Sequence, residues 1–311
     1  LNDSAAITGF ETLLSKKLVL VTGKGGIGKS TIATALGQLS AEAGRRTLIV
    51  QNAAVDQISP LFGLPSTYDR CVQVQPRLDV LNVDSVTNFR DYMVEHLGQR
   101  RLYDTVFSNR VVKSLINAVP GWSDVMLLGR LLFECELRPN HEFVIFDAPA
   151  SGHFMNLMTT PDAVLAMKLG GPLHKETQRV RSFLADPSIS TTVYVGVPEE
   201  LVVSECLDFL PQLRKLSPST LGGLFMNRLP RALADLTASS PARDYALRHH
   251  AAAAEALKVL RTGLQDPQIN LSDLPVWSVP DLGYITEPLQ PGFGYDLLVE
   301  GSKQLKSAGG M

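Results

Sequence analysis

A glycine-rich loop near the start of the chain constrains the fold more than any other feature. Residues 23–30 read GKGGIGKS and fit the pattern G-x-x-x-x-G-K-[ST], which is typical of a phosphate-binding loop. The loop lies between an apolar run at 18–21 and an Ala- and Leu-rich stretch that predicts a helix over 30–43. Glycines let successive backbone N–H groups turn toward phosphate oxygens, and the following helix directs its positive dipole end at the anion. The sequence therefore predicts a nucleotide site at the end of a parallel strand.

Each position of this loop has an expected part in binding. Lys29 is expected to reach the β- and γ-phosphates, and the Ser30 hydroxyl is expected to ligate Mg²⁺. Thr31 is placed to bond the α-phosphate. The expected nucleotide-binding set is Gly23, Lys24, Gly25, Gly26, Ile27, Gly28, Lys29, Ser30 and Thr31.

Short apolar runs alternate with helix-like stretches along the chain. The runs predict strands over 18–21, 47–50, 80–83, 143–146, 163–167, 192–197, 221–226 and 276–279. Further helices are expected over 172–183 and 242–260. Because the runs show little polar alternation, the strands should be buried on both faces. We expect an α/β fold, a three-layer α/β/α sandwich with a mainly parallel sheet, as one domain over 1–311.

The pattern changes between residues 85 and 137. Apolar residues at helical spacing over 89–97, over 111–119 and at Val125, Leu128 and Leu132 predict a helical subdomain inserted between two strands. These stripes either pack into the subdomain core or line a groove.

Composition excludes several classes of protein. The 31 acidic and 29 basic residues nearly balance, which argues against a nucleic-acid partner. The apolar runs are strand-sized, so no integral membrane segment is expected, and residues 1–17 lack the pattern of a signal peptide. Cys71, Cys135 and Cys206 are scattered, offer no disulfide framework and are each expected to be small core residues. A reducing, cytoplasmic location is expected.

Two further polar segments follow predicted strands. The first reads DAPASGH over 147–153; Asp147 at the strand end is expected to hold Mg²⁺, directly or through water. Gly152 can bring its N–H to a γ-phosphate, whereas His153 either relays a signal from that phosphate or caps a helix. The second reads FMNR over 225–228, where Asn227 either pairs its amide with the adenine edge or forms a turn.

These motifs resemble those of the ArsA/Get-type family, which contains arsenical-pump and tail-anchored-protein-targeting ATPases. KGGIGKS resembles the signature-lysine, or deviant Walker A, P-loop, and DAPASGH resembles the DTAPTGH switch II of this group. Gly171-Pro172 and the PEEL segment at 198–201 resemble the bacterial branch of the group. The resemblance implies a P-loop NTPase fold, ATP and Mg²⁺ as ligands, and ATP hydrolysis. It also implies a homodimer in which Lys24 reaches the partner's nucleotide.

The chain departs from this family at two sites. Switch I in the family carries Asp-Pro-Ala-His, but residues 51–57 here read QNAAVDQ, so the position of the water-orienting Asp falls on Asn52. A neutral amide orients water but accepts a proton poorly, so slow hydrolysis is expected, with Asp56 as the less favoured substitute. The CxxC pairs that share zinc in the targeting enzymes are missing, so neither that zinc nor clustered-thiol arsenite binding is expected.

The resemblance implies a nucleotide-driven switch that gates a hydrophobic client groove. Its candidate lining is Met93, Val111, Leu115, Met126, Leu128, Leu131, Phe154, Met155, Leu157 and Met158. One alternative is a positioning ATPase like ParA or MinD, which needs a basic DNA face or a membrane helix. The other is a hydrolysis-weak regulatory subunit with a paralogous partner, which the altered switch I favours.

Overall fold

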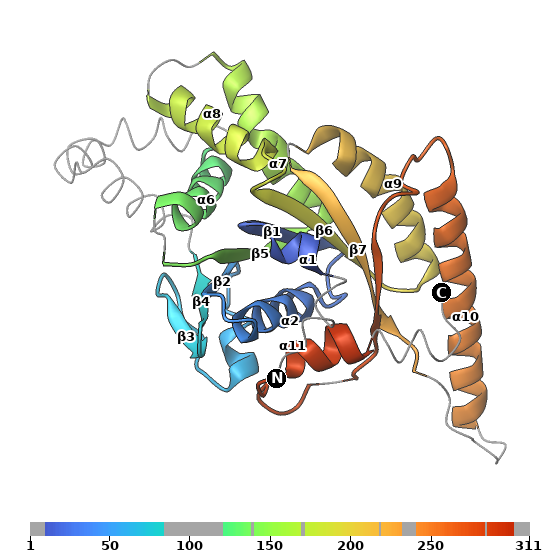
Figure 1. The fold of residues 1–311 in the computed structure, drawn as a ribbon. Helices are drawn as coiled ribbons and strands as arrows, with labels where there is room; N and C mark the ends of the chain where they lie inside the picture. Colours follow the sequence, from blue (N-terminus) through green and yellow to red (C-terminus); the bar gives the residue numbers. More distant parts are fainter. Residues whose placement is uncertain are drawn as a thin grey trace.

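An eight-stranded sheet forms the centre of the molecule in the computed structural model, which describes residues 10–83, 121–137, 140–168, 172–217, 219–231, 241–283 and 285–301 (Figure 1). The strand order is β3-β4-β2-β5-β1-β6-β7-β8, and β3 alone runs antiparallel to its neighbour. The strands are β1 (Leu18–Gly23), β2 (Thr47–Gln51), β3 (Val72–Gln75), β4 (Leu78–Asn82), β5 (Phe143–Ala150), β6 (Ser190–Gly196), β7 (Thr220–Leu229) and β8 (Val276–Pro280).

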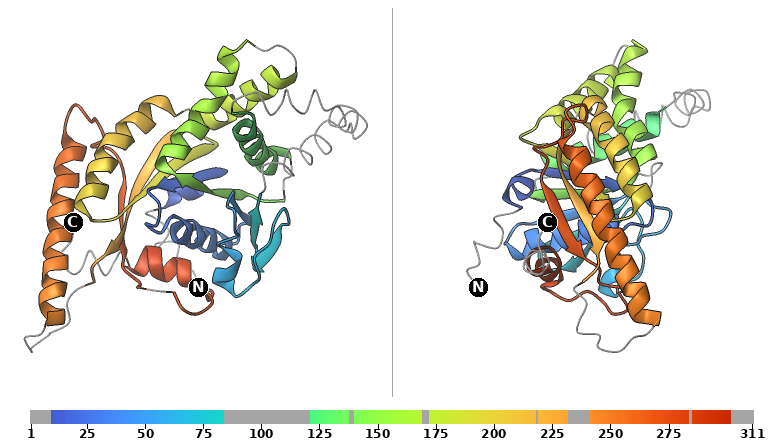
Figure 2. Two further views of the ribbon diagram at one scale, coloured as in Figure 1. Left: turned by 180° about the vertical axis from the view of Figure 1, so that it is seen from behind. Right: turned by 90° about the vertical axis from the view of Figure 1, so that its right-hand side faces the viewer.

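Helices cover both faces of this sheet. One face carries α1 (Glu11–Leu14), α2 (Lys29–Glu42) and α11 (Phe293–Tyr295), which continues as η3 (Asp296–Glu300). The other carries α6 (Trp122–Leu132), η2 (Phe133–Leu137), α7 (Ser151–Ala166) and α8 (Pro172–Ala185). Over β6 and β7 lies α9 (Glu200–Leu216), and α10 (Pro241–Gln265) packs along α9 at the molecule's side (Figure 2). A short turn, η1 (Ser59–Phe62), follows β2.

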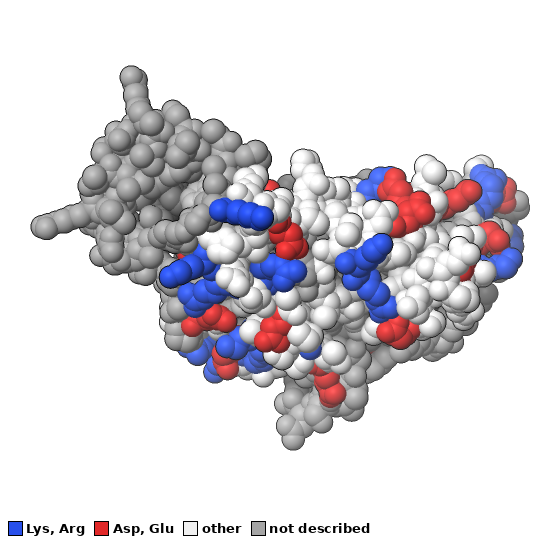
Figure 3. Space-filling model, turned by 90° about the horizontal axis from the view of Figure 1, so that it is seen from above, with Lys and Arg blue, Asp and Glu red and all other residues white. Residues whose placement is uncertain are grey.

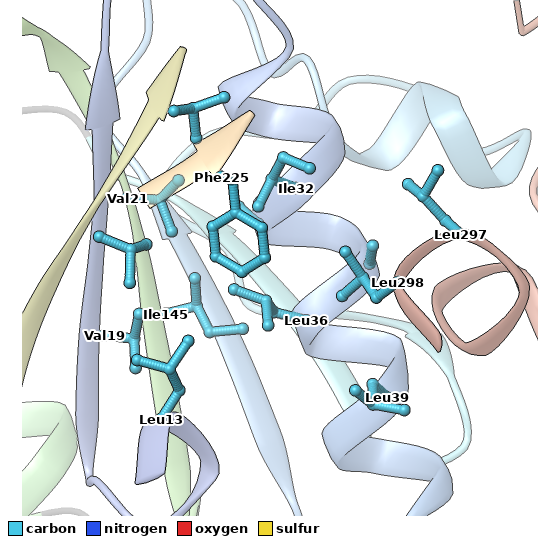
Figure 4. Close-up of a cluster of buried hydrophobic side chains, with 14 of the residues drawn as sticks. Leu13, Val19, Val21, Ile32, Leu36, Leu39, Ile145, Phe225, Leu297 and Leu298 are labelled. Atoms are coloured by element: carbon cyan, nitrogen blue, oxygen red, sulfur yellow. The ribbon is translucent and has the colours of Figure 1, made fainter. Parts of the chain in front are cut away.

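The core explains why the strands read as continuous apolar runs. On one face of the sheet, Val21 and Ile145 pack toward Ile32 and Leu36 of α2, and Leu298 closes the cluster from the far side of that helix (Figure 4). The alternate residues of the same strands pack beneath α6, α7 and α8. Burial on both faces confirms the predicted α/β fold with its mainly parallel sheet.

One predicted strand is wrong and one strand was missed. Residues 163–167 do not form a strand, because most of them belong to the end of α7. The buried residues of α7 recur every three or four positions (Phe154, Leu157, Met158, Thr160, Pro161 and Val164), and this helical face outweighs the short apolar run. The missed strand, β3, reads VQVQ and lies half-exposed at the sheet edge, so it offers no apolar run to detect.

Most of the predicted insertion, including its first two stripes, lies outside the described residues. The third stripe belongs to α6, where Val125, Leu128 and Leu132 are buried. The candidate groove residues Leu128, Leu131, Phe154 and Met158 are likewise buried, in the cluster beneath α6 and α7. These residues therefore form core in this state.

Two cysteines meet the core expectation and one contradicts it. Cys135 and Cys206 are buried, but Cys71 is exposed because it immediately precedes the edge strand β3. Among the described residues, no helix combines the length with the apolar composition that a bilayer span requires.

Candidate nucleotide-binding site

The predicted site residues gather at one edge of the sheet. Asp147 on β5 is in register with Val21 of β1 on one side and Gln51 of β2 on the other. The loops after these strands therefore leave from the same edge, because carboxyl ends of parallel strands lie together. Asn227, near the end of β7, joins them through a direct contact with the loop after β1.

The glycine-rich loop adopts a backbone that only glycine tolerates at several positions. Gly28, which precedes α2, has φ of 93°, in the left-handed region. A Cβ built there would lie 2.3 Å from Nδ2 of Asn227. The motif glycine at this position is therefore required both by its dihedral angle and by the close approach of β7.

The end of β7 holds the loop from behind. Asn227 Nδ2 donates to the Ile27 carbonyl at 2.8 Å, and Arg228 donates to the Gly26 carbonyl at 2.8 Å. In a trans peptide the N–H points opposite to the C=O, so these bonds turn the N–H groups of Ile27 and Gly28 away from β7. The adenine role of Asn227 stays a prediction. Arg228 was missed, since no sequence signal distinguishes it from other strand-end arginines.

Two oxygen ligands meet beside the loop. Ser30 Oγ donates to Asp147 Oδ2 at 2.6 Å, and Asp147 Oδ1 is buried without a hydrogen-bond partner among the described residues. Burial raises the pKa of Asp147, although the Ser30 hydrogen bond and the Lys29 charge oppose that rise. A hydroxyl and an under-coordinated buried carboxylate are hard oxygen donors, so this corner fits the predicted Mg²⁺.

The two loop lysines have different surroundings. Lys29 is partly buried and donates to the Lys24 carbonyl at 3.1 Å; burial lowers its pKa while Asp147 raises it. Lys24 points outward and forms an ion pair with Glu205 of α9 at 2.8 Å. Both side chains of that pair are about half exposed, at 42% and 52%. Glu205 lies 181 residues from Lys24 in the sequence, and no local sequence pattern predicts the pairing.

The loop after β2 separates the two candidates for water positioning. Asn52 is exposed, and its amide donates to the Val83 carbonyl at 2.7 Å. Asp56 is buried and saturated, because it accepts hydrogen bonds from Gln51, from the backbone N–H groups of Ile58 and Ser59, and from both N–H and hydroxyl of Thr67. Burial alone would raise the pKa of Asp56, but its hydrogen bonds with Ser59, Thr67 and Ile58 outweigh that effect and lower the pKa. Asp56 thus organises the loop.

The remaining predicted residues lie in the first turn of α7. Gly152 and His153 are both exposed at this helix start, directly after β5. A Cβ at Gly152 would meet nothing within 4 Å, so the side of the residue on which a side chain would stand is open.

This chain is similar to known proteins that are described as ATPases. Residues 16–170 match the family model described as "Anion-transporting ATPase". The chain is 31% identical over 235 residues to the ATPase BagA of Mycobacterium tuberculosis, covering 68% of this chain and 65% of that protein. It is 26% identical over 153 residues to the ATPase ASNA1 homolog 1 of Paramecium tetraurelia, covering 47% and 44% of the two chains. The chain thus spans just under two thirds of the length of its mycobacterial relative.

Proposed function

Because this chain belongs to the ArsA-type, anion-transporting ATPase family, we propose that it binds ATP with Mg²⁺ and hydrolyses the nucleotide slowly as an ATP-linked homodimer. The observation that carries the proposal is the pair of Ser30 and Asp147 beside the braced loop, with one carboxylate oxygen buried and unpartnered among the described residues. A cytoplasmic location is part of the proposal and is supported by cysteines that form no disulfide.

The proposed binding step uses groups of the glycine-rich loop and of the segments that end β5 and β7. Backbone N–H groups of residues 24–30 and the Lys29 ammonium hold the phosphates, and Thr31 bonds the α-phosphate. Ser30 and Asp147 hold Mg²⁺, which when bound neutralises charge on the β- and γ-phosphates. Lys29 leaves the Lys24 carbonyl to reach the phosphates. Gly152 brings its N–H to the γ-phosphate, and Asn227 reads the adenine edge with its carbonyl oxygen.

The proposed dimer requires Lys24 to leave its own chain. The Lys24–Glu205 pair is a surface ion pair, and such pairs contribute about 0.2–1 kcal/mol. The ATP phosphates of a partner subunit carry more negative charge than the Glu205 carboxylate and would be less exposed to solvent in the dimer. Exchange of Glu205 for the partner's nucleotide therefore costs little and couples dimerisation to ATP.

Slow hydrolysis follows from the chemistry of Asn52. Its N–H donates to Val83, so the amide oxygen is the group that orients water, without a base to take the proton. Asn52→Asp is expected to accelerate single-turnover hydrolysis, whereas Asp56→Asn should act on loop stability. The assignment would be contradicted if Asp56→Asn lost all turnover while it kept ATP binding and the unfolding temperature of the unmodified protein, and if Asn52→Asp left the hydrolysis rate unchanged.

Client carriage is a further part of the proposal and makes a structural demand. Because Leu128, Leu131, Phe154 and Met158 are core, a groove lined by them requires α6 and α7 to separate when ATP binds. The α7 helix begins directly after Asp147–Ala150, so nucleotide state can move it. Equal binding of a hydrophobic dye with and without MgATP would reject the groove.

Turnover of the full chain, with Lys29→Ala as a control, tests the enzyme itself. MgATP binding and slow turnover that Lys29→Ala abolishes support the proposal. Binding without turnover would favour a regulatory subunit, whose paralogue a pull-down in the ATP-bound state would recover. ATP-dependent DNA or vesicle binding would favour a ParA- or MinD-like switch, although acidic and basic side chains of the described residues are interspersed on the face in Figure 3.

A further inference from the structure

A second cluster of reactive side chains lies at the opposite edge of the sheet from the nucleotide loop. Cys71 precedes β3, Asp79 is near the start of β4, and His141 precedes β5. In the parallel sheet, the starts of β4 and β5 lie at the amino edge, whereas Asp147 and the loop after β1 lie at the carboxyl edge. This cluster is therefore separate from the chemistry described above.

The three side chains converge closely enough to share one ion. The candidate ligand atoms of Cys71, Asp79 and His141 all lie within 4.8 Å of one another, and His141 Nε2 is 2.8 Å from Asp79 Oδ2. A Zn²⁺ ion that binds N, O and S ligands at about 2.0–2.3 Å needs them about 3.3–3.8 Å apart. A contraction of about 1 Å is within reach of the exposed Cys71 side chain by rotation.

The surroundings of the histidine indicate which ring nitrogen faces the cluster. The His141 side chain is only 8% exposed, yet its Nδ1 is buried and has no hydrogen-bond partner among the described residues. Its Nε2 lies 2.8 Å from Asp79 Oδ2, so Nε2 is the nitrogen that can share a metal with that carboxylate, whereas the buried Nδ1 needs a separate partner such as a water. Metal-binding histidines usually donate the other ring N–H to a carboxylate, a carbonyl or water, so a metal on Nε2 leaves Nδ1 to such a partner.

The cluster opens into a cavity of about 360 Å³ that can admit an ion and its water. Arg46 and Arg77 also line this cavity. Arg46 is paired with Glu142, and Arg77 donates to the Gly44 carbonyl. Glu134, which is paired with Arg130, adds a further carboxylate to the wall. A thiolate, a carboxylate and a neutral imidazole together match the charge of one divalent cation.

We propose that Cys71, Asp79 and His141 bind one divalent transition-metal ion of the zinc class, with a water in the fourth position. The donor set of one S, one O and one N selects a borderline-soft ion over Mg²⁺ or Ca²⁺. This site lies within one chain and differs from a zinc clasp between subunits, which needs CxxC pairs that this sequence lacks.

Calorimetric titration of the full chain with ZnCl₂, and optical titration with Co²⁺, test the proposal. We expect one ion per chain and a thiolate-to-Co²⁺ charge-transfer band. Burial raises the pKa of Cys206 to about 12 and that of Cys135 still further, so Cys71 is the thiol able to give this band. Cys71→Ser should abolish the band, and His141→Asn should weaken Zn²⁺ binding at least about tenfold.

Two control variants separate this site from other metal ligands. His249→Ala removes an exposed histidine of α10, and Asp147→Asn removes the carboxylate proposed for Mg²⁺. Both should retain the band and the Zn²⁺ affinity of the unmodified chain. The exposed position of Cys71 makes Cys71→Ser compatible with folding, which an unchanged unfolding temperature in metal-free buffer would verify. Absence of stoichiometric Zn²⁺ binding, or a band that survives Cys71→Ser, would overturn the proposal.

Discussion

Replacing Asp147 with asparagine should make the nucleotide-free protein more stable and the nucleotide-bound protein less stable. The Oδ1 atom of this carboxylate is buried and has no partner among the described residues, and burial raises the pKa of Asp147. Without Mg²⁺, the charged form therefore costs stability. Asp147→Asn removes the charge while its amide oxygen can still accept the Ser30 hydrogen bond.

The expected gain is about 1 kcal/mol, because the neutral amide avoids burial of a charge but leaves its own N–H groups unpaired. For a chain of this length that raises Tm by about 2 °C. MgATP at one hundred times its Kd should stabilise the unmodified protein by about 2.7 kcal/mol, or about 5 °C, and the variant should lose most of this increment.

Asp56→Asn is the matched control, since it makes the same chemical change at a saturated carboxylate. An amide facing the Thr67 donors loses two charge-assisted hydrogen bonds, each worth about 1.5–3 kcal/mol, so Tm should fall by about 6 °C or more. Its MgATP increment should persist. Scanning calorimetry of the three proteins, with and without MgATP, gives all six values.

The pH dependence provides a second check on Asp147. Because its folded pKa is raised, its stability contribution is complete below the unfolded pKa near 4 and is lost as pH rises through the folded pKa. The Tm advantage of Asp147→Asn should therefore vanish near pH 3 and appear as pH rises. A nucleotide-free variant that melts below the unmodified protein at pH 7, or one that keeps the MgATP increment, would refute this reasoning.

Three other predictions follow from contacts at the same edge. Glu205→Gln releases Lys24 in both subunits and should tighten MgATP-dependent dimerisation about 2- to 30-fold in sedimentation velocity, because two pairs of about 0.2–1 kcal/mol are no longer broken. Unchanged or weaker association would argue against release of a competing ion pair. Gly28→Ala should abolish ATP binding in calorimetry by displacing Asn227, and normal affinity would show that the brace is dispensable. The lowered pKa of Asp56 gives stability above pH 4 that is lost on acidification, so the Tm gap to Asp56→Asn should narrow from pH 7 to pH 3; a constant gap would contradict this.

The predictable parts of this protein are those with local causes. The loop of residues 23–30 follows one buried strand, and Asp147 lies near the end of the strand beside it. Because these strands are parallel, their ends lie together, which explains the 2.6 Å hydrogen bond between Ser30 and Asp147. The order of helices and strands is also predictable, because each element has its own local apolar pattern. The error at residues 163–167 arose because a run of a few residues does not distinguish a strand from one turn of a long helix.

The unpredictable parts depend on partners far away in sequence. Glu205 reaches Lys24, and Arg228 reaches the loop, only after the sheet has assembled. The saturation of Asp56 was equally hidden, because most of its donors are backbone N–H groups whose placement the turn itself creates. Cys71 was misassigned since edge position, which sequence periodicity does not reveal, decides its exposure.

The brace behind the glycine-rich loop has a consequence for nucleotide selectivity. One end of the Asn227 amide already holds the Ile27 carbonyl, so only the other end is available to a base. Under the proposed adenine role, one planar group serves as both a reader of the base and a support of the phosphate cradle. A base that fits poorly and rotates this amide would also weaken its hydrogen bond to the Ile27 carbonyl. A change of nucleobase would therefore alter the affinity of the loop for the triphosphate.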